Sequence, residues 1–253
     1  MDHTGHHALV TGGGTGIGLG IALGLAGLGA QVTITGRDAK RLETVAAMHP
    51  RLHPMQMDVG DEASVRAGIE EAAELRGPIP ICVANAGIAE PAQFRHETLD
   101  HWRKTMVTNL DGVFLTFQAA MATQERDAFG RMVAISSIAG LRGLKGASAY
   151  TASKHGVIGL VRALSEEYLG SKITFNAVCP GYVDTPIVDR NAAQIAESQK
   201  MSEEDARDML ARANRHKRLL GTDEVTATAL WLCSSAARSV NGQAIQIAGG
   251  HVT

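Results

Sequence analysis

HALVTGGGTGIG, residues 7–18, is the stretch that decides the fold. Its first four residues are typical of a short buried strand, and the apolar run 19–28 behind the glycines has helical spacing. Strand, glycine-rich turn and helix in this order form a dinucleotide-binding unit. Glycines allow a tight turn and close approach of the backbone to a pyrophosphate, while the helix N-terminus offers free N–H groups. The stretch therefore predicts a dinucleotide site near the start of the chain.

Strand-like and helix-like segments alternate through the rest of the sequence. Six further strands are expected at 31–35, 52–57, 79–84, 131–136, 172–178 and 243–247. Helical apolar spacing occupies 38–48, 61–75, 99–124, 150–169 and 222–234. This alternation predicts an α/β, single-domain, doubly wound Rossmann-type fold with a seven-stranded parallel sheet. Ligands of such folds bind at the carboxyl ends of the strands.

Composition fits one compact domain and excludes several partner classes. The 253 residues contain no Pro/Ser-rich linker or charge block, so we expect a single domain over 1–253. A net charge of −2 gives no electrostatic reason to propose nucleic acid or an anionic membrane as partner. No apolar stretch approaches the ~20 residues that cross a bilayer, and residues 1–5 lack a signal pattern. We therefore expect a cytoplasmic protein.

The cysteines and the N-terminal histidines give no metal or disulfide signal. The three cysteines are odd in number, widely spaced and without a CxxC pair: Cys82, Cys179 and Cys233. The histidine cluster at the chain start, His3, His6 and His7, is expected to be solvated rather than metal-bound. We predict no metal site.

A second informative stretch is Tyr150-Thr151-Ala152-Ser153-Lys154, thirteen residues downstream of Ser137. Four residues make slightly more than one helical turn, so the phenol and the ammonium share one helix face. A nearby cation favours the ionised phenol and is expected to lower the pKa of Tyr150 towards the range useful for proton transfer. The structural alternative is a surface helix on which Tyr150 and Lys154 lie side by side without a functional role.

Taken with the glycine turn, these residues resemble the short-chain dehydrogenase/reductase family over almost the whole chain. Six motifs follow in the family's order: TGxxxGxG at 11–18, NAG at 85–87, a helix asparagine at Asn109, the serine at Ser137, YxxxK at 150–154, and PG at 180–181. The resemblance implies that Tyr150 exchanges a proton with the substrate oxygen, which Ser137 binds. It implies that Lys154 assists Tyr150 and bonds the nicotinamide ribose, and that Asn109 holds a water on the proton path to Lys154. Asn109 satisfied by backbone alone is the structural alternative.

The resemblance also implies a set of cofactor contacts. They are Gly12, Gly14, Thr15, Gly16, Ile17 and Gly18 in the first turn, Asp58 and Val59 after the third strand, Asn85, Ala86 and Gly87, the pair Tyr150 and Lys154, and Pro180, Gly181, Val183 and Thr185. Two of these have a structural alternative, since Asp58 and Thr185 could each cap the helix that follows.

The nucleotide preference depends on the end of the second strand, Thr35-Gly36-Arg37-Asp38. NAD-preferring relatives place an acid where this chain has Gly36. Arg37 follows instead, and its planar fork of donors suits a 2′-phosphate. Asp38 could partly neutralise it, and an exposed arginine without a ligand is the alternative. We predict NADP, with NAD as the alternative.

The implied function is an NADP(H)-dependent oxidoreductase that interconverts a ketone and a secondary alcohol, with a 3-oxoacyl thioester or a related carbonyl compound as candidate substrate. The alternatives are an NAD-dependent secondary-alcohol or 3-hydroxyacyl dehydrogenase and, more remotely, a dinucleotide-binding protein without turnover. In 3-hydroxybutyrate dehydrogenases, polar carboxylate-binding positions stand where this chain has Ala89, Ala139 and Ala147. In relatives, the helical, polar region 187–218 is the substrate lid. The family also implies a homotetramer.

Overall fold

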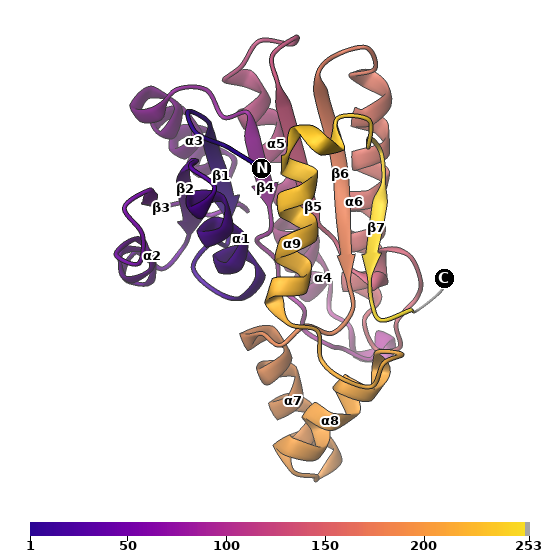
Figure 1. The fold of residues 1–253 in the computed structure, drawn as a ribbon. Helices are drawn as coiled ribbons and strands as arrows, with labels where there is room; N and C mark the ends of the chain where they lie inside the picture. The colour runs from indigo at the N-terminus through magenta and orange to yellow at the C-terminus, as the bar shows by residue number, and fades with distance from the viewer. Residues whose placement is uncertain (251–253) are drawn as a thin grey trace.

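A seven-stranded, all-parallel sheet forms the centre of the computed structural model, which describes residues 1–250. Its strand order is β3-β2-β1-β4-β5-β6-β7 (Figure 1). The strands are β1 (His7–Thr11), β2 (Gln31–Gly36), β3 (Leu52–Gln56), β4 (Ile81–Ala84), β5 (Gly130–Ile135), β6 (Ile173–Pro180) and β7 (Ala244–Ile247). The predicted doubly wound fold is confirmed, and the topology reverses between β1 and β4. Residues 251–253 of the predicted domain lie outside the described residues.

Helices cover both faces of the sheet. They are α1 (Gly16–Gly27), α2 (Ala39–Ala46), α3 (Glu62–Arg76), α4 (Leu99–Met106), α5 (Gly112–Ala122), α6 (Ser148–Glu167), α7 (Pro186–Gln199), α8 (Glu203–Ala213) and α9 (Thr222–Cys233). One core cluster joins α1, α2 and α9 to one face of the sheet. A second joins α3, α5 and α6 to the other face. Because both faces are covered, β1, β4, β5 and β6 are buried along their whole length.

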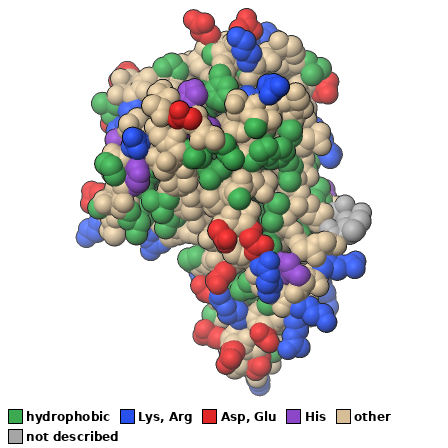
Figure 2. Space-filling model, in the orientation of Figure 1, with side chains coloured by type: hydrophobic (Ala, Val, Ile, Leu, Met, Phe, Trp, Pro, Cys, Tyr) green, Lys and Arg blue, Asp and Glu red, His purple; other side chains and the backbone are tan. Residues whose placement is uncertain are grey.

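The helices α7 and α8 project beyond the carboxyl ends of the strands and have a small apolar cluster of their own (Figure 1). Charged side chains crowd this projection (Figure 2). Arg207 of α8 pairs there with Asp184 and with Asp189 of α7. Ser202 caps α8 by accepting a hydrogen bond from the amide of Asp205.

Two elements differ from the sequence-based expectation. The single helix predicted over 99–124 is divided into α4 and α5 by a π-helical turn, Val107–Asp111. Strand β4 begins at Ile81 rather than at residue 79, because Pro80 has no N–H for the ladder. The carbonyl of Pro80 still accepts a hydrogen bond from the amide of Arg131 at 2.7 Å.

The N-terminal histidines are not all solvated, so that prediction is wrong for two of them. His3 and His7 are only 2% and 3% exposed. The amide of His3 donates to the carbonyl of Leu28, which ties the chain start to the end of α1. His7 Nδ1 lies 2.9 Å from the carbonyl oxygen of Gly77, and its Nε2 lies 2.8 Å from Thr33 Oγ1. Burial lowers the pKa of both rings, which keeps them neutral.

None of the helices in residues 1–250 combines the length and the apolar character of a membrane-spanning helix.

Candidate active site

The turn between β1 and α1 is built for close approach of the backbone to a ligand. Gly12 has φ +64°, a conformation that favours glycine. At Gly18 a Cβ atom would lie 2.4 Å from the carbonyl oxygen of Gly12, so no larger residue fits. Helix α1 has no acidic residue in its first turn, and its N-cap, Thr15, makes no side-chain capping bond. The first N–H groups of α1 are therefore not capped by that side chain, and the turn fits a pyrophosphate.

The NAG segment holds this turn in place. The carboxamide of Asn85 donates to the carbonyl of Thr11 at 2.9 Å and to that of Gly12 at 3.3 Å. In the opposite direction, Thr11 Oγ1 accepts hydrogen bonds from the amides of Asn85 (2.9 Å) and Ala86 (3.0 Å). Thr11 is only 1% exposed, and sequence analysis did not single it out. These bonds join the ends of β1 and β4 where the topology reverses.

We expect Thr11→Val to destabilise the protein by about 2 kcal/mol, because two buried amides lose their acceptor while the side-chain volume is kept. Urea denaturation followed by circular dichroism measures this loss. Thr11→Ser is the matched control, since it keeps the hydroxyl. If the valine and serine variants unfold at the same urea concentration, the hydroxyl does not hold the turn.

Arg37 follows β2 directly and is exposed. Asp38 does not neutralise it, contrary to the sequence-based concern. The Asp38 carboxylate caps α2 by accepting from the amide of Arg41 at 3.1 Å, and it lies 3.6 Å from Arg41 Nε. The aliphatic part of Arg41 lies beside Gly14, 3.5 Å from where a Cβ would stand. Arg41 therefore lies beside the glycine turn, and the sequence analysis did not foresee it.

The segment after β3 settles one alternative. Asp58 does not cap α3, because Asp61 does so by accepting from the amide of Ala63. Asp58 Oδ1 instead accepts from the amide of Gly60 at 3.0 Å, and Asp58 is exposed. Val59 is 7% exposed and packs closely against Gly112 of α5.

Tyr150 and Lys154 lie on α6, one turn apart, as predicted. Lys154 is 4% exposed, and its Nζ donates to the carbonyl of Ile135 at 2.8 Å. The Nζ atom lies 5.7 Å from the centre of the Tyr150 ring. Burial lowers the pKa of Lys154 to about 8.

The pKa of Tyr150 departs from the prediction. It is raised, first because burial penalises the phenolate, whereas the Ser137 side chain acts in the lowering direction. The lowering contribution comes from Ser137 and not from Lys154. The phenol is thus protonated at neutral pH and ready to donate.

The structure separates the two neighbouring serines. Ser136 Oγ donates its hydrogen to the carbonyl of Lys154 at 3.1 Å. Ser137 Oγ accepts from the amide of Ala139 at 3.1 Å, so its own hydrogen stays available for a ligand oxygen. Of the two, Ser137 is the one suited to bind an oxygen.

Asn109 lies fully buried inside the π-helical turn. Its Oδ1 accepts from the amide of Ile88 at 2.8 Å, and its Nδ2 donates to the carbonyl of Ile88 at 2.9 Å. A Cβ on Gly87 would stand 3.2 Å from Asn109 Oδ1 and 3.6 Å from Lys154 Nζ. Asn109 thus fixes the loop after β4 against the lysine, and π-turns of this kind are frequent at functional sites.

The turn after β6 faces the glycine turn. A Cβ on Gly16 would lie 3.2 Å from Thr185 Cγ2. Thr185 stands at the N-cap of α7 without capping it, since its hydroxyl donates to the carbonyl of Val183 at 3.2 Å. The side-chain capping alternative for Thr185 is therefore wrong, and Thr185 lies where two turns at the carboxyl edge of the sheet meet.

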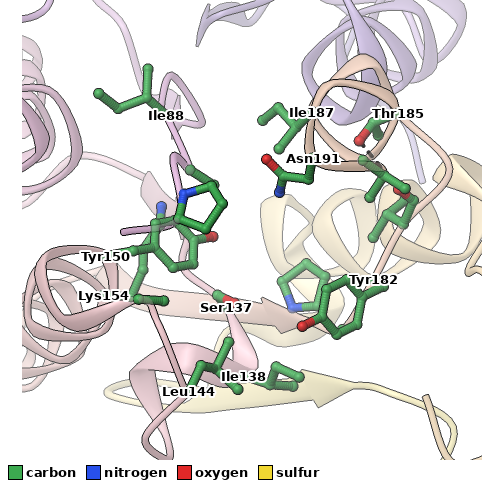
Figure 3. Close-up of a pocket in the computed structure, with 18 of the residues that line it drawn as sticks. Ile88, Ser137, Ile138, Leu144, Tyr150, Lys154, Tyr182, Thr185, Ile187 and Asn191 are labelled. Carbon is green, nitrogen blue, oxygen red and sulfur yellow. Dashed lines mark hydrogen bonds between the residues drawn. The ribbon is translucent and has the colours of Figure 1, made fainter. Parts of the chain in front are cut away.

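A cavity of about 270 Å³ gathers most of these groups (Figure 3). The predicted residues that line it are Ile17, Asn85, Gly87, Ser137, Tyr150, Lys154, Pro180, Gly181, Val183 and Thr185. The predicted residues outside its lining are Gly12, Gly14, Thr15, Gly16, Gly18, Arg37, Asp58, Val59, Ala86 and Asn109. The far wall includes Tyr182, Ile187, Asn191 and Leu210, which the sequence analysis did not name as site residues. The last three lie in the region 187–218 that the family resemblance gives as the lid, and Tyr182 directly follows Pro180-Gly181.

Comparison with known proteins agrees with this geometry. Residues 6–196 match the model of the short chain dehydrogenase family. The cis-4-hydroxycyclohexanecarboxylate dehydrogenase of Sinomonas cyclohexanicum is 37% identical over 250 residues, covering 96% of this chain and 95% of its own. The 3-oxoacyl-[acyl-carrier-protein] reductase of Aquifex aeolicus is 32% identical over 251 residues, covering 97% of both chains.

A solved structure agrees as well. The crystal structure of an actinorhodin polyketide ketoreductase variant with NADPH superposes with a TM-score of 0.93 at 32% identity. The match covers 97% of this chain and 96% of that one. The family match agrees with the sheet order, with the glycine turn and with the grouping of Ser137, Tyr150 and Lys154 at one cavity. The chain therefore belongs to the short chain dehydrogenase family.

Proposed function

We propose that this protein is an NADP(H)-dependent ketoreductase that interconverts a ketone and a secondary alcohol. Its family makes it an oxidoreductase of ketones and alcohols that uses a nicotinamide dinucleotide. The observation that carries the finer proposal is the convergence of Ser137, Tyr150 and Lys154 on the cavity that Ile17 of the glycine turn also lines.

The residues divide the chemistry among them. A nicotinamide bound in this cavity would supply or accept the hydride. Ser137 donates a hydrogen bond to the carbonyl oxygen, and Tyr150 gives its proton to that oxygen as negative charge develops. Lys154, held by the carbonyl of Ile135, has further N–H groups for the ribose hydroxyls. Asn109 acts through the loop that it fixes and through a water on the proton path to Lys154.

The remaining predicted contacts hold the nucleotide. Gly12 to Gly18 receive the pyrophosphate, and Arg37 the 2′-phosphate. Asp58 binds the adenine amine, beside Val59. Val183 and Thr185 bind the carboxamide. The homotetramer, the cytoplasmic location and the role of 187–218 as a lid stay predictions of the family.

Two substrate classes follow from the relatives. The ketoreductase and 3-oxoacyl reductase names support a 3-oxoacyl thioester or a related ketone. The alternative, an NAD-dependent secondary-alcohol or 3-hydroxyacyl dehydrogenase, draws support from the relative that is named for a 4-hydroxycyclohexanecarboxylate.

The first test is a fluorescence titration of the purified protein with NADPH and with NADH. The tighter nucleotide is then used to screen ketones, 3-oxoacyl thioesters and secondary alcohols by absorbance at the nicotinamide band. We expect NADPH to bind more tightly and to drive ketone reduction. Tighter binding of NADH would favour the dehydrogenase alternative, and nucleotide binding without any turnover would favour a non-catalytic protein.

We expect Arg37→Ala to raise the Kd of NADPH by about 10- to 100-fold, because a charge-assisted contact to the 2′-phosphate is lost. The Kd of NADH should change less than about twofold, since NADH has no such phosphate. Arg51→Ala is the matched control, because Arg51 is also exposed but precedes β3, at the amino ends of the strands, whereas Arg37 lies at their carboxyl ends. Equal losses for NADPH and NADH would remove the phosphate assignment.

A further inference from the structure

The cavity wall provided by the β6–α7 turn and α7 carries two polar side chains among apolar ones. Tyr182 follows β6, and Asn191 lies on α7. Figure 3 shows the Tyr182 hydroxyl and the Asn191 carboxamide projecting into the space that Tyr150 and Ser137 border. Their neighbours in the wall are Ile138, Leu144, Ile187 and Leu210. Few polar groups in an apolar pocket usually orient a ligand.

Neither polar group has a hydrogen-bond partner within the described part of the chain. Within residues 1–250, no hydrogen bond reaches the Tyr182 hydroxyl or the Asn191 carboxamide. The contrast with Asn109 and Asn214 is clear, since both of those carboxamides are satisfied by backbone groups. Tyr182 and Asn191 are both partly exposed, so water can reach these groups until a ligand oxygen takes its place.

Tyr182 is also held firmly by its backbone. Its amide donates to Asn214 Oδ1 at 3.0 Å, and its carbonyl accepts from Asn214 Nδ2 at 2.8 Å and from the amide of Leu220 at 2.9 Å. Asn214 is only 1% exposed, and a Cβ on Gly181 would lie 2.4 Å from its Oδ1. The backbone of Tyr182 is therefore fixed relative to the end of β6, which limits the positions that its hydroxyl can take.

The charged groups around the cavity do not favour an anionic ligand group at this wall. Burial raises the pKa of Tyr182, while Arg142 acts in the opposite direction, so the phenol is neutral at pH 7. The one acid in the lining, Glu90, is held by Lys104 at 2.9 Å. Lys145 lines the cavity but is exposed to solvent. Ala89 and Ala147 add no charge.

We propose that Tyr182 and Asn191 bind a second, uncharged oxygen of the substrate, so that the substrates are compact ketones with a further carbonyl or hydroxyl group. The reacting carbonyl meets Ser137 and Tyr150, the apolar wall covers the carbon skeleton, and the second oxygen meets the Tyr182 hydroxyl and the Asn191 carboxamide. This inference rests on the proposed function for the place of the reacting carbonyl.

The test compares three ligands built on the same six-membered ring: cyclohexanone, cyclohexane-1,4-dione and 4-oxocyclohexane-1-carboxylate. Their Kd values are measured by calorimetry on the full chain with NADP⁺ bound, a state without turnover. We expect the wild type to bind the dione about 10-fold more tightly than cyclohexanone. In Tyr182→Phe and Asn191→Leu that ratio should fall towards one while the Kd of cyclohexanone changes less than about twofold. Tyr168→Phe is the matched control and should keep the ratio.

Three outcomes overturn the inference. The wild type could bind the dione and cyclohexanone equally, or Tyr182→Phe could weaken both ligands by the same factor, as a purely structural role would. Alternatively, the carboxylate could bind best and lose its advantage in Lys145→Met. Turnover of the dione with NADPH is measured separately, so its absence counts against the proposed ketoreductase while the binding ratio still decides on the subsite.

Discussion

Replacing Tyr150 by Phe lowers kcat of ketone reduction by at least about 1,000-fold, while the Kd of NADPH changes less than about twofold. Proton transfer by a positioned side chain contributes typically ~10²–10⁴-fold to a rate, and no other phenol in the cavity is placed one turn from a lysine. The protonated state of Tyr150 at neutral pH makes it the donor in the reductive direction. Steady-state rates at the nicotinamide band and a fluorescence titration measure the two quantities.

Two other tyrosines give this experiment its controls. Tyr168 packs on Phe175 with ring centres 5.3 Å apart, outside the cavity, so Tyr168→Phe should keep full activity. Tyr182→Phe should keep turnover of a simple ketone, because Tyr182 serves the second oxygen. Retained reduction by Tyr150→Phe, with the nucleotide bound, would falsify the assignment of Tyr150 as the proton donor.

The sequence predicts well what depends on local chemistry. Four of the strands, β1, β4, β5 and β6, are buried along their whole length and are mostly apolar, and all seven were found within two residues of their bounds. The glycine turn and the Tyr150–Lys154 spacing are local as well, because one turn or one helix face contains each whole motif. Membership in the family adds the order in which such motifs occur.

What the sequence does not show depends on contacts between distant segments. The carboxamide of Asn109, inside the π-turn, pairs with Ile88, twenty-one residues earlier. The direction of the Tyr150 pKa shift follows from burial, which a helix-face argument leaves out. Tyr182 lines the cavity, and Asn214, thirty-two residues later, holds its backbone.

Lys154→Met should inactivate the enzyme and at the same time stabilise the folded protein. We expect kcat of reduction to fall at least about 100-fold, because the buried ammonium beside Tyr150 is removed. The free energy of unfolding at pH 7 should rise by about 2 kcal/mol. Burying the ammonium costs about 3 kcal/mol when the pKa falls from 10.5 to about 8, and the lost bond to the carbonyl of Ile135 offsets about 1 kcal/mol of the gain.

The pH dependence of this stabilisation has a definite sign. Below pH 8 both folded and unfolded wild-type chains carry the proton, so the full cost of the buried charge is present. Between pH 8 and 10.5 the unfolded chain binds more protons than the folded one, so the wild type gains stability as the pH rises. The stability advantage of Lys154→Met should therefore shrink across this window.

Urea denaturation of the nucleotide-free protein at pH 7, 8.5 and 10 measures this advantage, with the exposed Lys172→Met as control. If the methionine variant is less stable than the wild type at pH 7, more than the carbonyl of Ile135 must stabilise the ammonium. The buried charge of Lys154 would then not lower the stability of the folded protein.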